Sequence, residues 1–135
     1  MASEHYDVLV IDGGTAGLVA AKRAAGGRRK VAIVERDRLG GECLWTGCIP
    51  AKTLLNSASI YRTIQKAQDY GLPADNEPLN WPDVVRAKDE VVARIAREDG
   101  EKALASADAA FLRGSAAFLS QHEVLVFGQI ALAQA

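Results

Sequence analysis

Two apolar runs near the amino terminus have the pattern of strands that are buried on both faces. Residues 7–11 read Asp-Val-Leu-Val-Ile and residues 31–34 read Val-Ala-Ile-Val, so neither run alternates with polar positions. Between them, residues 15–25 are rich in alanine and other strong helix formers, and a glycine pair stands on either side. A strand, a helix and a strand within about thirty residues predict one βαβ unit with parallel strands.

The middle of the chain predicts two longer helices. The first runs from Pro50 to about Ala67, and the second runs from Pro82, a residue suited to the first turn of a helix, to about Ala105. Residues 70–80 contain a glycine and two prolines, which predicts a surface connection. The apolar side chains available for the buried side of the second helix are Val84, Val85, Val91, Val92, Ile95 and Leu104.

The last part of the chain has the pattern of short strands. They are expected at residues 109–112, 116–119, 124–127 and 130–132, with glycine or polar residues between them. We therefore predict an α/β fold, in which an incomplete Rossmann-like βαβ domain is followed by a small antiparallel β-meander.

Composition and charge narrow the class of protein. The 135 residues suffice for one domain, and 49% apolar with 24% charged residues is ordinary globular composition. A formal net charge of -1 does not point to nucleic acid or to an anionic membrane. No apolar run approaches the roughly 20 residues that span a bilayer, and no signal peptide precedes the first strand. We expect a soluble cytoplasmic protein, in which two cysteines need a role other than that of a structural disulfide.

The turn after the first strand resembles a dinucleotide-binding turn in spacing but not in every residue. Its three glycine positions would be 12, 14 and 17, and Asp12 stands at the first of them. An ordinary strand–helix corner would explain the turn alone equally well. However, Glu35 ends the next strand about 20 residues further along the chain. There it could accept hydrogen bonds from ribose hydroxyls. The alternative is that Glu35 is only a solvated strand end. Asp tolerates left-handed dihedral angles, so we expect the turn to survive with weakened affinity for a diphosphate.

The cysteine pair is the most informative feature. On an ideal helix the Cα atoms of Cys43 and Cys48 would be roughly 8.6 Å apart, above the limit of about 7 Å for a disulfide. A bridge therefore requires the chain to leave regular helix before Cys48, and Gly47 supplies the freedom. Pro50 places the start of the following helix near Cys48, where the helix dipole and free amides lower a thiol pKa.

A zinc site and a pair of inert core cysteines both fit the sequence less well. A structural zinc site needs four ligands, but no second cysteine pair exists and the histidines, His5 and His122, stand alone in the sequence. Inert core cysteines are possible for an arbitrary pair, yet they do not account for the glycines and the proline around this one.

The segment from Gly40 to Lys52, Gly-Gly-Glu-Cys-Leu-Trp-Thr-Gly-Cys-Ile-Pro-Ala-Lys, resembles the signature of the pyridine nucleotide-disulfide oxidoreductases. These include dihydrolipoamide dehydrogenase, glutathione reductase and mercuric reductase. The residues between the cysteines are most similar to those of mercuric-reductase-like and dihydrolipoamide-dehydrogenase-like members. The resemblance extends from Tyr6 to Phe118 and implies that the βαβ unit is an FAD-binding domain.

The resemblance also implies roles for individual residues. Cys48 would be the thiol next to the flavin and Cys43 the thiol that meets the substrate. NAD(P)H would reduce FAD, the flavin would reduce the Cys43–Cys48 disulfide, and Cys43 would react by thiol–disulfide exchange with a small disulfide or mercuric-ion substrate. The implied cofactor-binding residues are Gly13, Gly14, Thr15, Ala16 and Gly17 at the pyrophosphate, Glu35 at the adenosine ribose, Arg36, Gly41, Glu42 and Cys43 along the cofactor, and Lys52 near the flavin.

The chain differs from the family in the domains and residues that we expect it to contain. We expect residues 1–135 to be the amino-terminal part of the FAD-binding domain, without the nicotinamide-binding and dimerisation domains of the homodimeric family and without its histidine–glutamate base. Ala51 also replaces the usual serine or lysine. Two alternatives therefore stay open: a catalytically inactive truncated fragment, and a protein whose cysteine pair binds soft metals without flavin.

Overall fold

The computed structural model describes residues 3–74, 77–126 and 129–133, and its centre is a parallel three-stranded sheet. The strands are β2 (Val8–Ile11), β3 (Val31–Glu35) and β4 (Ala109–Arg113), in the order β2-β3-β4. Helix α1 (Thr15–Ala25) connects β2 to β3. The predicted βαβ unit is therefore confirmed.

The central strand β3 is buried on both faces. Val31 and Ile33 pack against Leu18 and Ala21 of α1 and Leu104, and all five side chains are less than 8% exposed. On the opposite face, Ala32 and Val34 pack in a second cluster with Tyr6, Val124 and Val126. Successive residues of a strand point to opposite faces, which is why an uninterrupted apolar run suits a sheet with two covered faces. Burying each of the larger side chains contributes about 1.5–3 kcal/mol.

A second, four-stranded sheet covers the face of the parallel sheet opposite α1. Its order is β1-β7-β6-β5, formed by β1 (Ser3–Tyr6), β5 (Ala116–Phe118), β6 (Glu123–Val126) and β7 (Gln129–Ala133). The antiparallel pairs β5–β6 and β6–β7 confirm the predicted meander, while β1, which we did not predict, pairs in parallel with β7. Two positions of the predicted tail, Phe127 and Gly128, lie outside the described residues.

The first strand of the tail does not belong to the meander. We expected it beside the other short strands, but β4 pairs in parallel with β3, with Val31 opposite Ala109. Parallel neighbours need a connection of about a dozen residues or more, and the helical excursion between β3 and β4 supplies it. The apolar pattern of the strand alone did not distinguish the two sheets.

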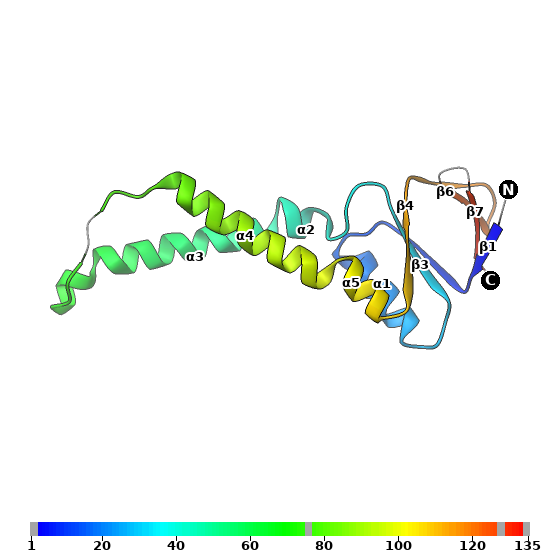
Figure 1. Ribbon diagram of the computed structural model, residues 1–135, viewed down its shortest axis with the longest axis horizontal. Coiled ribbons are helices and arrows are strands. Elements are labelled where there is room, and N and C mark those ends of the chain that lie inside the picture. The colour runs from blue at the N-terminus through cyan, green and yellow to red at the C-terminus, as the bar shows by residue number, and fades with distance from the viewer. Residues whose placement is uncertain (1–2, 75–76, 127–128, 134–135) are drawn as a thin grey trace.

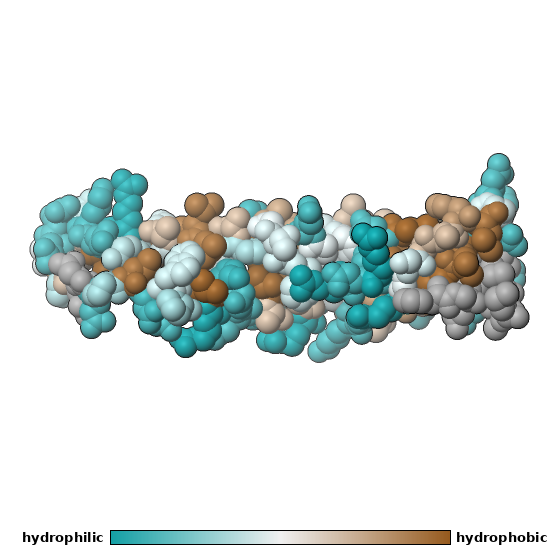
Figure 2. All heavy atoms as spheres, turned by 90° about the horizontal axis from the view of Figure 1, so that it is seen from above, coloured by the Kyte–Doolittle hydropathy of each residue, from teal (hydrophilic) through white to brown (hydrophobic). Residues whose placement is uncertain are grey.

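That excursion forms a long helical arm, visible at the left of Figure 1. It contains α2 (Gly41–Trp45), α3 (Cys48–Gln65), the short 3₁₀ helix η1 (Ala67–Tyr70), α4 (Trp81–Asp99) and α5 (Glu101–Ser106). Helices α3 and α4 lie side by side. None of the residues of α3, all of which are described, is fully buried. Figure 2 shows apolar patches along the arm. The exposed apolar side chains of these helices include Leu55 and Trp81.

The second predicted helix is interrupted. Instead of one helix from Pro82 to about Ala105, the chain forms α4 and α5, which meet at Gly100. Gly100 is buried, and a Cβ atom there would approach the carbonyl oxygen of Ala96 to 2.5 Å. The close approach at this glycine lets the chain turn so that Leu104 of α5 enters the core next to α1.

The buried phenol of Tyr6 predicts a loss of stability at alkaline pH. Burial, a hydrogen bond that Tyr6 Oη donates to Glu4 Oε2 (2.6 Å) and the negative charge of Glu4 raise the pKa of Tyr6 to about 12 from 10.0. The neutral phenol is favoured in the folded state, so its contribution is complete below pH 10 and is lost as the pH rises through 12. Urea denaturation between these values should show a steeper loss of stability in the native sequence than in Tyr6→Phe. Parallel curves for the two proteins would contradict this assignment.

Candidate dinucleotide and dithiol site

The turn between β2 and α1 is held in a conformation that requires a small residue at position 17. A Cβ atom on Gly17 would collide with the carbonyl oxygen of Asp12. Asp12 itself has φ of 93°, so the turn does survive without glycine at its first position, as predicted. The amide of Asp12 donates to the carbonyl oxygen of Val34 (2.9 Å), which ties the turn to β3.

The Asp12 side chain occupies part of the helix N-terminus. Its Oδ1 accepts a hydrogen bond from the amide of Gly14 at 3.1 Å. Gly14 is the N-cap residue of α1, and such amides are the groups that bind the phosphates of a dinucleotide. The carboxylate therefore lies where an anionic ligand would receive its hydrogen bond.

Glu35 fastens two turns to each other. Its Oε2 accepts from the amide of Gly13 and its Oε1 from the amide of Asp37, both at 2.8 Å. Partial burial acts to raise the pKa of Glu35, but the amide hydrogen bonds from Asp37, Gly13 and Arg36 outweigh it and lower the pKa. Contact of this carboxylate with a ribose stays a prediction.

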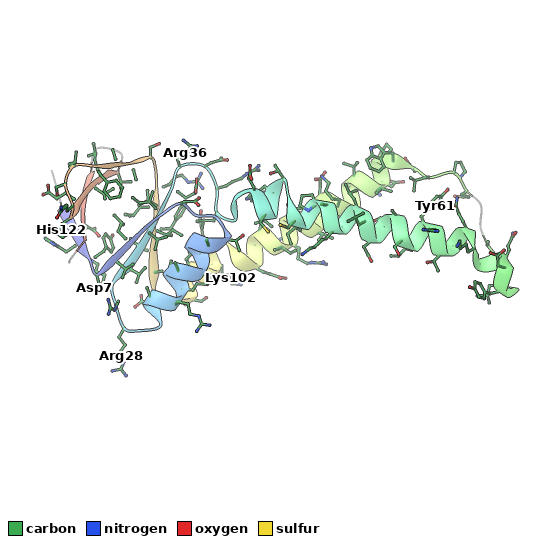
Figure 3. The ribbon with its side chains drawn as sticks, turned by 180° about the vertical axis from the view of Figure 1, so that it is seen from behind. Asp7, Arg28, Arg36, Tyr61, Lys102 and His122 are labelled. Carbon is green, nitrogen blue, oxygen red and sulfur yellow. The ribbon has the colours of Figure 1, made fainter. Side chains whose placement is uncertain are left out.

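A hollow of about 810 Å³ lies beyond the carboxyl ends of the parallel strands. It brings together five of the predicted cofactor residues: Gly14, Glu35, Arg36, Gly41 and Glu42. In Figure 3, Arg36 extends from the loop after β3, whereas His122 lies on the second sheet, far from the cysteine-bearing helices. His122 is exposed and lies between β5 and β6. A larger hollow of about 1270 Å³ contains none of the predicted residues.

The hollow of about 810 Å³ also contains residues that the sequence did not predict. Gly114 and Ser115 follow β4, and the amide of Gly114 donates to the carbonyl oxygen of Glu35 (2.8 Å). Ligands of open parallel sheets bind outside the carboxyl ends of the strands, so correct placement of β4 would have identified both residues. Arg38 stacks on Trp45, 4.1 Å from the ring centroid, and no sequence spacing indicated that pair.

Two glycines bring α2 against the turn. The amide of Gly40 donates to the carbonyl oxygen of Gly13 (2.8 Å), and Gly14 and Gly40 form a β-bridge. A Cβ atom on Gly41 would come within 2.9 Å of the Gly14 Cα, and both Gly40 (φ 106°) and Gly41 (φ 55°) have left-handed backbone angles. A side chain at either position would separate the cysteine segment from the turn.

The chain leaves the helix between the cysteines, as predicted. Helix α2 ends at Trp45, α3 begins at Cys48, and the amide of Gly47 donates to the carbonyl oxygen of Glu42 at 2.6 Å. Cys48 is therefore the first residue of α3. Both thiols are free; Cys43 is half-buried and Cys48 is exposed. The two side chains lie close enough for each to shift the pKa of the other.

The protonation of the pair differs from the expectation. A hydrogen bond from the Cys48 thiol, a second from the Thr15 hydroxyl, the backbone amide of Cys48 and the charge of Lys52 together lower the pKa of Cys43. Donation to Cys43, and the negative charge there, raise the pKa of Cys48. We had predicted a thiolate at Cys48, but the amide at the start of α3 also donates to the neighbouring sulfur. In the free dithiol the pKa of Cys43 is therefore lowered relative to that of Cys48, and the two thiols titrate as one unit.

The predicted site residues thus come from three segments that meet at one end of α1. Gly13 and Gly17 are buried in the turn, Thr15 and Ala16 are exposed in the first turn of α1, and Lys52 is exposed one turn after Cys48. In the described ranges no group of three or more metal-ligating side chains occurs, and no helix there is long and apolar enough to cross a membrane.

A parallel βαβ unit whose glycine turn opens a helix defines a dinucleotide-binding domain, and the adjoining dithiol makes it one of the redox type. Comparison with known proteins agrees, because the model of the pyridine nucleotide-disulphide oxidoreductases matches residues 6–130. The chain belongs to that family. Its members are FAD-dependent, with a pyridine nucleotide as co-substrate.

Individual relatives support the same assignment. The chain is 48% identical over 96 residues to the dihydrolipoyl dehydrogenase of Bacillus subtilis (strain 168), a match that covers 71% of this chain and 20% of the relative. It is 40% identical over 127 residues to the dihydrolipoyl dehydrogenase of Mycoplasma pneumoniae, covering 93% and 27%. The enzyme of the same name from Chlamydia pneumoniae is 35% identical over 127 residues, covering 94% and 27%. The chain thus spans about a fifth to a quarter of the length of these relatives.

The Glu35 clamp predicts a pH-dependent contribution to stability. In Glu35→Gln one side-chain oxygen becomes an NH₂ group that cannot accept an amide hydrogen, so we expect a loss of about 1–2 kcal/mol at pH 7. Because the folded pKa of Glu35 lies below 4.5, the contribution is present above that pH and disappears as the pH falls through the folded value. Denaturation at pH 7, and at a pH about one unit below the unfolded pKa of Glu35, would measure the loss of stability in Glu35→Gln at each pH. An equal loss at the two pH values would show that the charge of Glu35 is not responsible.

Proposed function

We propose that residues 1–135 form the amino-terminal part of the FAD-binding domain of a cytoplasmic, homodimeric dithiol–disulfide oxidoreductase that uses NAD(P)H. The observation that carries this proposal is the backbone contact that holds the segment with the two free cysteines, Cys43 and Cys48, against the glycine turn. When bound, FAD supplies two-electron transfer between the pyridine nucleotide and the disulfide. The other steps follow from the residues of this chain.

The residues present fit a dinucleotide. Side chains at Gly17 and Gly41 would collide with the backbone of the turn, and the lining of the hollow includes both Gly14 and Glu35. The amides at the start of α1 would hold the pyrophosphate, and Glu35 would hold the ribose. One residue opposes this fit, since Asp12 places a carboxylate on the amide of Gly14.

The asymmetry of the thiols suits the proposed exchange. Reduction of the Cys43–Cys48 disulfide by two electrons and two protons gives two thiols, of which Cys43 is the more acidic. The Cys43 thiolate attacks a substrate disulfide, expels one substrate thiol and forms a mixed disulfide. Cys48 then attacks the Cys43 sulfur, which releases the second substrate thiol and restores the disulfide. With a dithiol substrate such as dihydrolipoamide the same steps run in reverse.

For the substrate, the relatives favour a dihydrolipoyl group, because the three described above are dihydrolipoyl dehydrogenases. Mercuric ion is the second candidate. It is favoured by the contact between two free thiols, one of them exposed, because soft thiolate ligands select soft metals. A catalytically inactive truncated product is a third possibility, which FAD binding addresses.

Replacement of Asp12 tests the dinucleotide assignment. In Asp12→Gly the amide of Gly14 becomes available and a negative charge beside the diphosphate disappears, so the dissociation constant for FAD should fall by about three- to tenfold. Quenching of flavin fluorescence measures it. Asp37→Asn removes a charge from the same hollow without touching the turn and should change the constant less. If neither the native chain nor Asp12→Gly binds FAD at millimolar concentration, the flavin proposal for this chain is wrong.

The cysteine pair has a separate test. Mild oxidation should close an intramolecular disulfide, detected as loss of both free thiols without a change in oligomeric mass. Cys43→Ser and Cys48→Ser should each keep one thiol under the same conditions. Only intermolecular products from the native chain would refute the redox assignment. Stoichiometric retention of mercuric ion by a chain that neither binds FAD nor forms the disulfide would favour the soft-metal candidate instead.

A further inference from the structure

We propose that the larger hollow, of about 1270 Å³, is a docking surface for an acidic segment of a partner protein. Its lining comes from α1, α2, α4, α5 and the end of β4, and it contains none of the predicted cofactor residues or cysteines. The inference therefore goes beyond the flavin and dithiol chemistry and does not depend on it.

The first argument is the charge of the lining. The side chains described there include five cations and two carboxylates: Lys22, Arg38, Arg97, Lys102 and Arg113 against Glu98 and Glu101. The lining is therefore positive, whereas the whole chain has a formal net charge of -1. A positive surface of this kind attracts a partner of the opposite charge and favours its correct orientation.

The second argument is that part of this charge is not neutralised within the chain. Arg113 pairs with Glu101, with 3.5 Å between Nη2 and Oε1. In contrast, the side chains of Arg97 and Lys102 form no ion pair or hydrogen bond with any residue of the described ranges, and both residues are exposed. They can pair with carboxylates of a partner without breaking an existing interaction.

The third argument is the size and the composition of the larger hollow. Its volume exceeds the roughly 300–1,000 Å³ of most sites for small molecules. The indole of Trp45, on which Arg38 stacks, lies in the lining. The apolar lining also includes four alanines: Ala93, Ala96, Ala103 and Ala107. Tryptophan and arginine are enriched among the residues that dominate binding between proteins, so a peptide with acidic and apolar side chains suits this lining.

The junction of α4 and α5 places two of the cations. Gly100, at which the helices meet, is buried and lies in the lining of the larger hollow. A side chain at Gly100 would collide with the carbonyl oxygen of Ala96, and Leu104 anchors α5 in the core. The backbone that carries Arg97 and Lys102 is therefore fixed by packing before any partner binds.

A nucleic acid is the rival partner with the same sign of charge. Domains that bind nucleic acids usually have an excess of positive charge over the whole domain. This chain has a formal net charge of -1, and its positive side chains gather in one hollow with an apolar lining. These observations favour an acidic peptide.

Fluorescence anisotropy of a labelled peptide tests the inference. The probe is a short fluorescein-labelled peptide of glutamates with leucines interspersed, and its control has glutamine in place of glutamate. The native chain should bind the acidic peptide, and the affinity should fall as the salt concentration rises, because exposed charges are screened. In the double variant Arg97→Glu with Lys102→Glu, the dissociation constant for this peptide should rise about tenfold.

A second charge reversal provides the matched control. Arg28 and Arg29 are exposed in the turn after α1 and do not belong to the lining. Figure 3 shows Arg28 extending from this turn, whereas Lys102 lies on α5. The double variant Arg28→Glu with Arg29→Glu changes the net charge of the chain by the same amount, but it should weaken binding much less.

A thermal melt shows whether each variant is folded. If Arg97→Glu with Lys102→Glu does not fold, the neutral changes Arg97→Gln with Lys102→Gln, against Arg28→Gln with Arg29→Gln, supply the same comparison.

The outcomes are distinct. No binding of the acidic peptide at millimolar concentration, equal binding of the glutamine peptide, or equal weakening by the two charge reversals would overturn the inference. Tighter binding of a single-stranded oligonucleotide, abolished by the reversal at Arg97 and Lys102, would assign the larger hollow to a nucleic acid instead. FAD binding and closure of the cysteine disulfide are measured separately, and their failure in the native chain would refute only the proposed function.

Discussion

The backbone contact between Gly13–Gly14 and Gly40–Gly41 determines how the site is assembled. It joins the start of α1, which carries the dinucleotide turn, to the start of α2, which carries Cys43. Van der Waals contact between two backbones is possible only where neither carries a side chain, and the left-handed angles of Gly40 and Gly41 add a second requirement for glycine. The dithiol is consequently fixed with respect to the turn before any ligand binds, and the short α2 needs little stability of its own.

The parallel sheet provides the rigid base for that contact. Strand β3 is covered by α1 and α5 on one face and by the second sheet on the other, and its last residue, Glu35, fastens the amide of Gly13. The free energy of burying the β3 side chains thus supports the position of the turn, since Asp12 and Gly13 are both hydrogen-bonded to residues of β3. Functional groups on loops are placed accurately when the strands that carry those loops cannot move.

The parts that sequence reasoning recovered depend on local rules. The strands β2 and β3, the turn at Gly17 and the helix break before Cys48 each follow from residues that lie close together in the chain. The predicted burial on both faces holds for β3 but is wrong for β2, whose residues are half-buried and whose last residue, Ile11, is exposed, because β2 is an edge strand of its sheet. The strands with which β1 and β4 pair depend on which sheet edges are free elsewhere in the fold. The residues of a short apolar strand do not indicate which edge that is. The break at Gly100 also depended on packing, because an isolated glycine in a helical pattern is tolerated in many helices. Gly114 and Ser115 were missed for the same reason as β4.

The protonation of the cysteine pair shows why a local rule can give the wrong residue. The dipole of α3 acts on any sulfur near its start, and the sequence places Cys48 there. In the folded chain the Cys48 amide also contributes to lowering the pKa of Cys43, which belongs to a different helix. The helix that lowers a thiol pKa need not therefore be the helix that contains the thiol. The segment that carries Cys43 lies beside the start of α1 because the glycines of two distant segments can touch, and no rule based on neighbouring residues indicates such a contact.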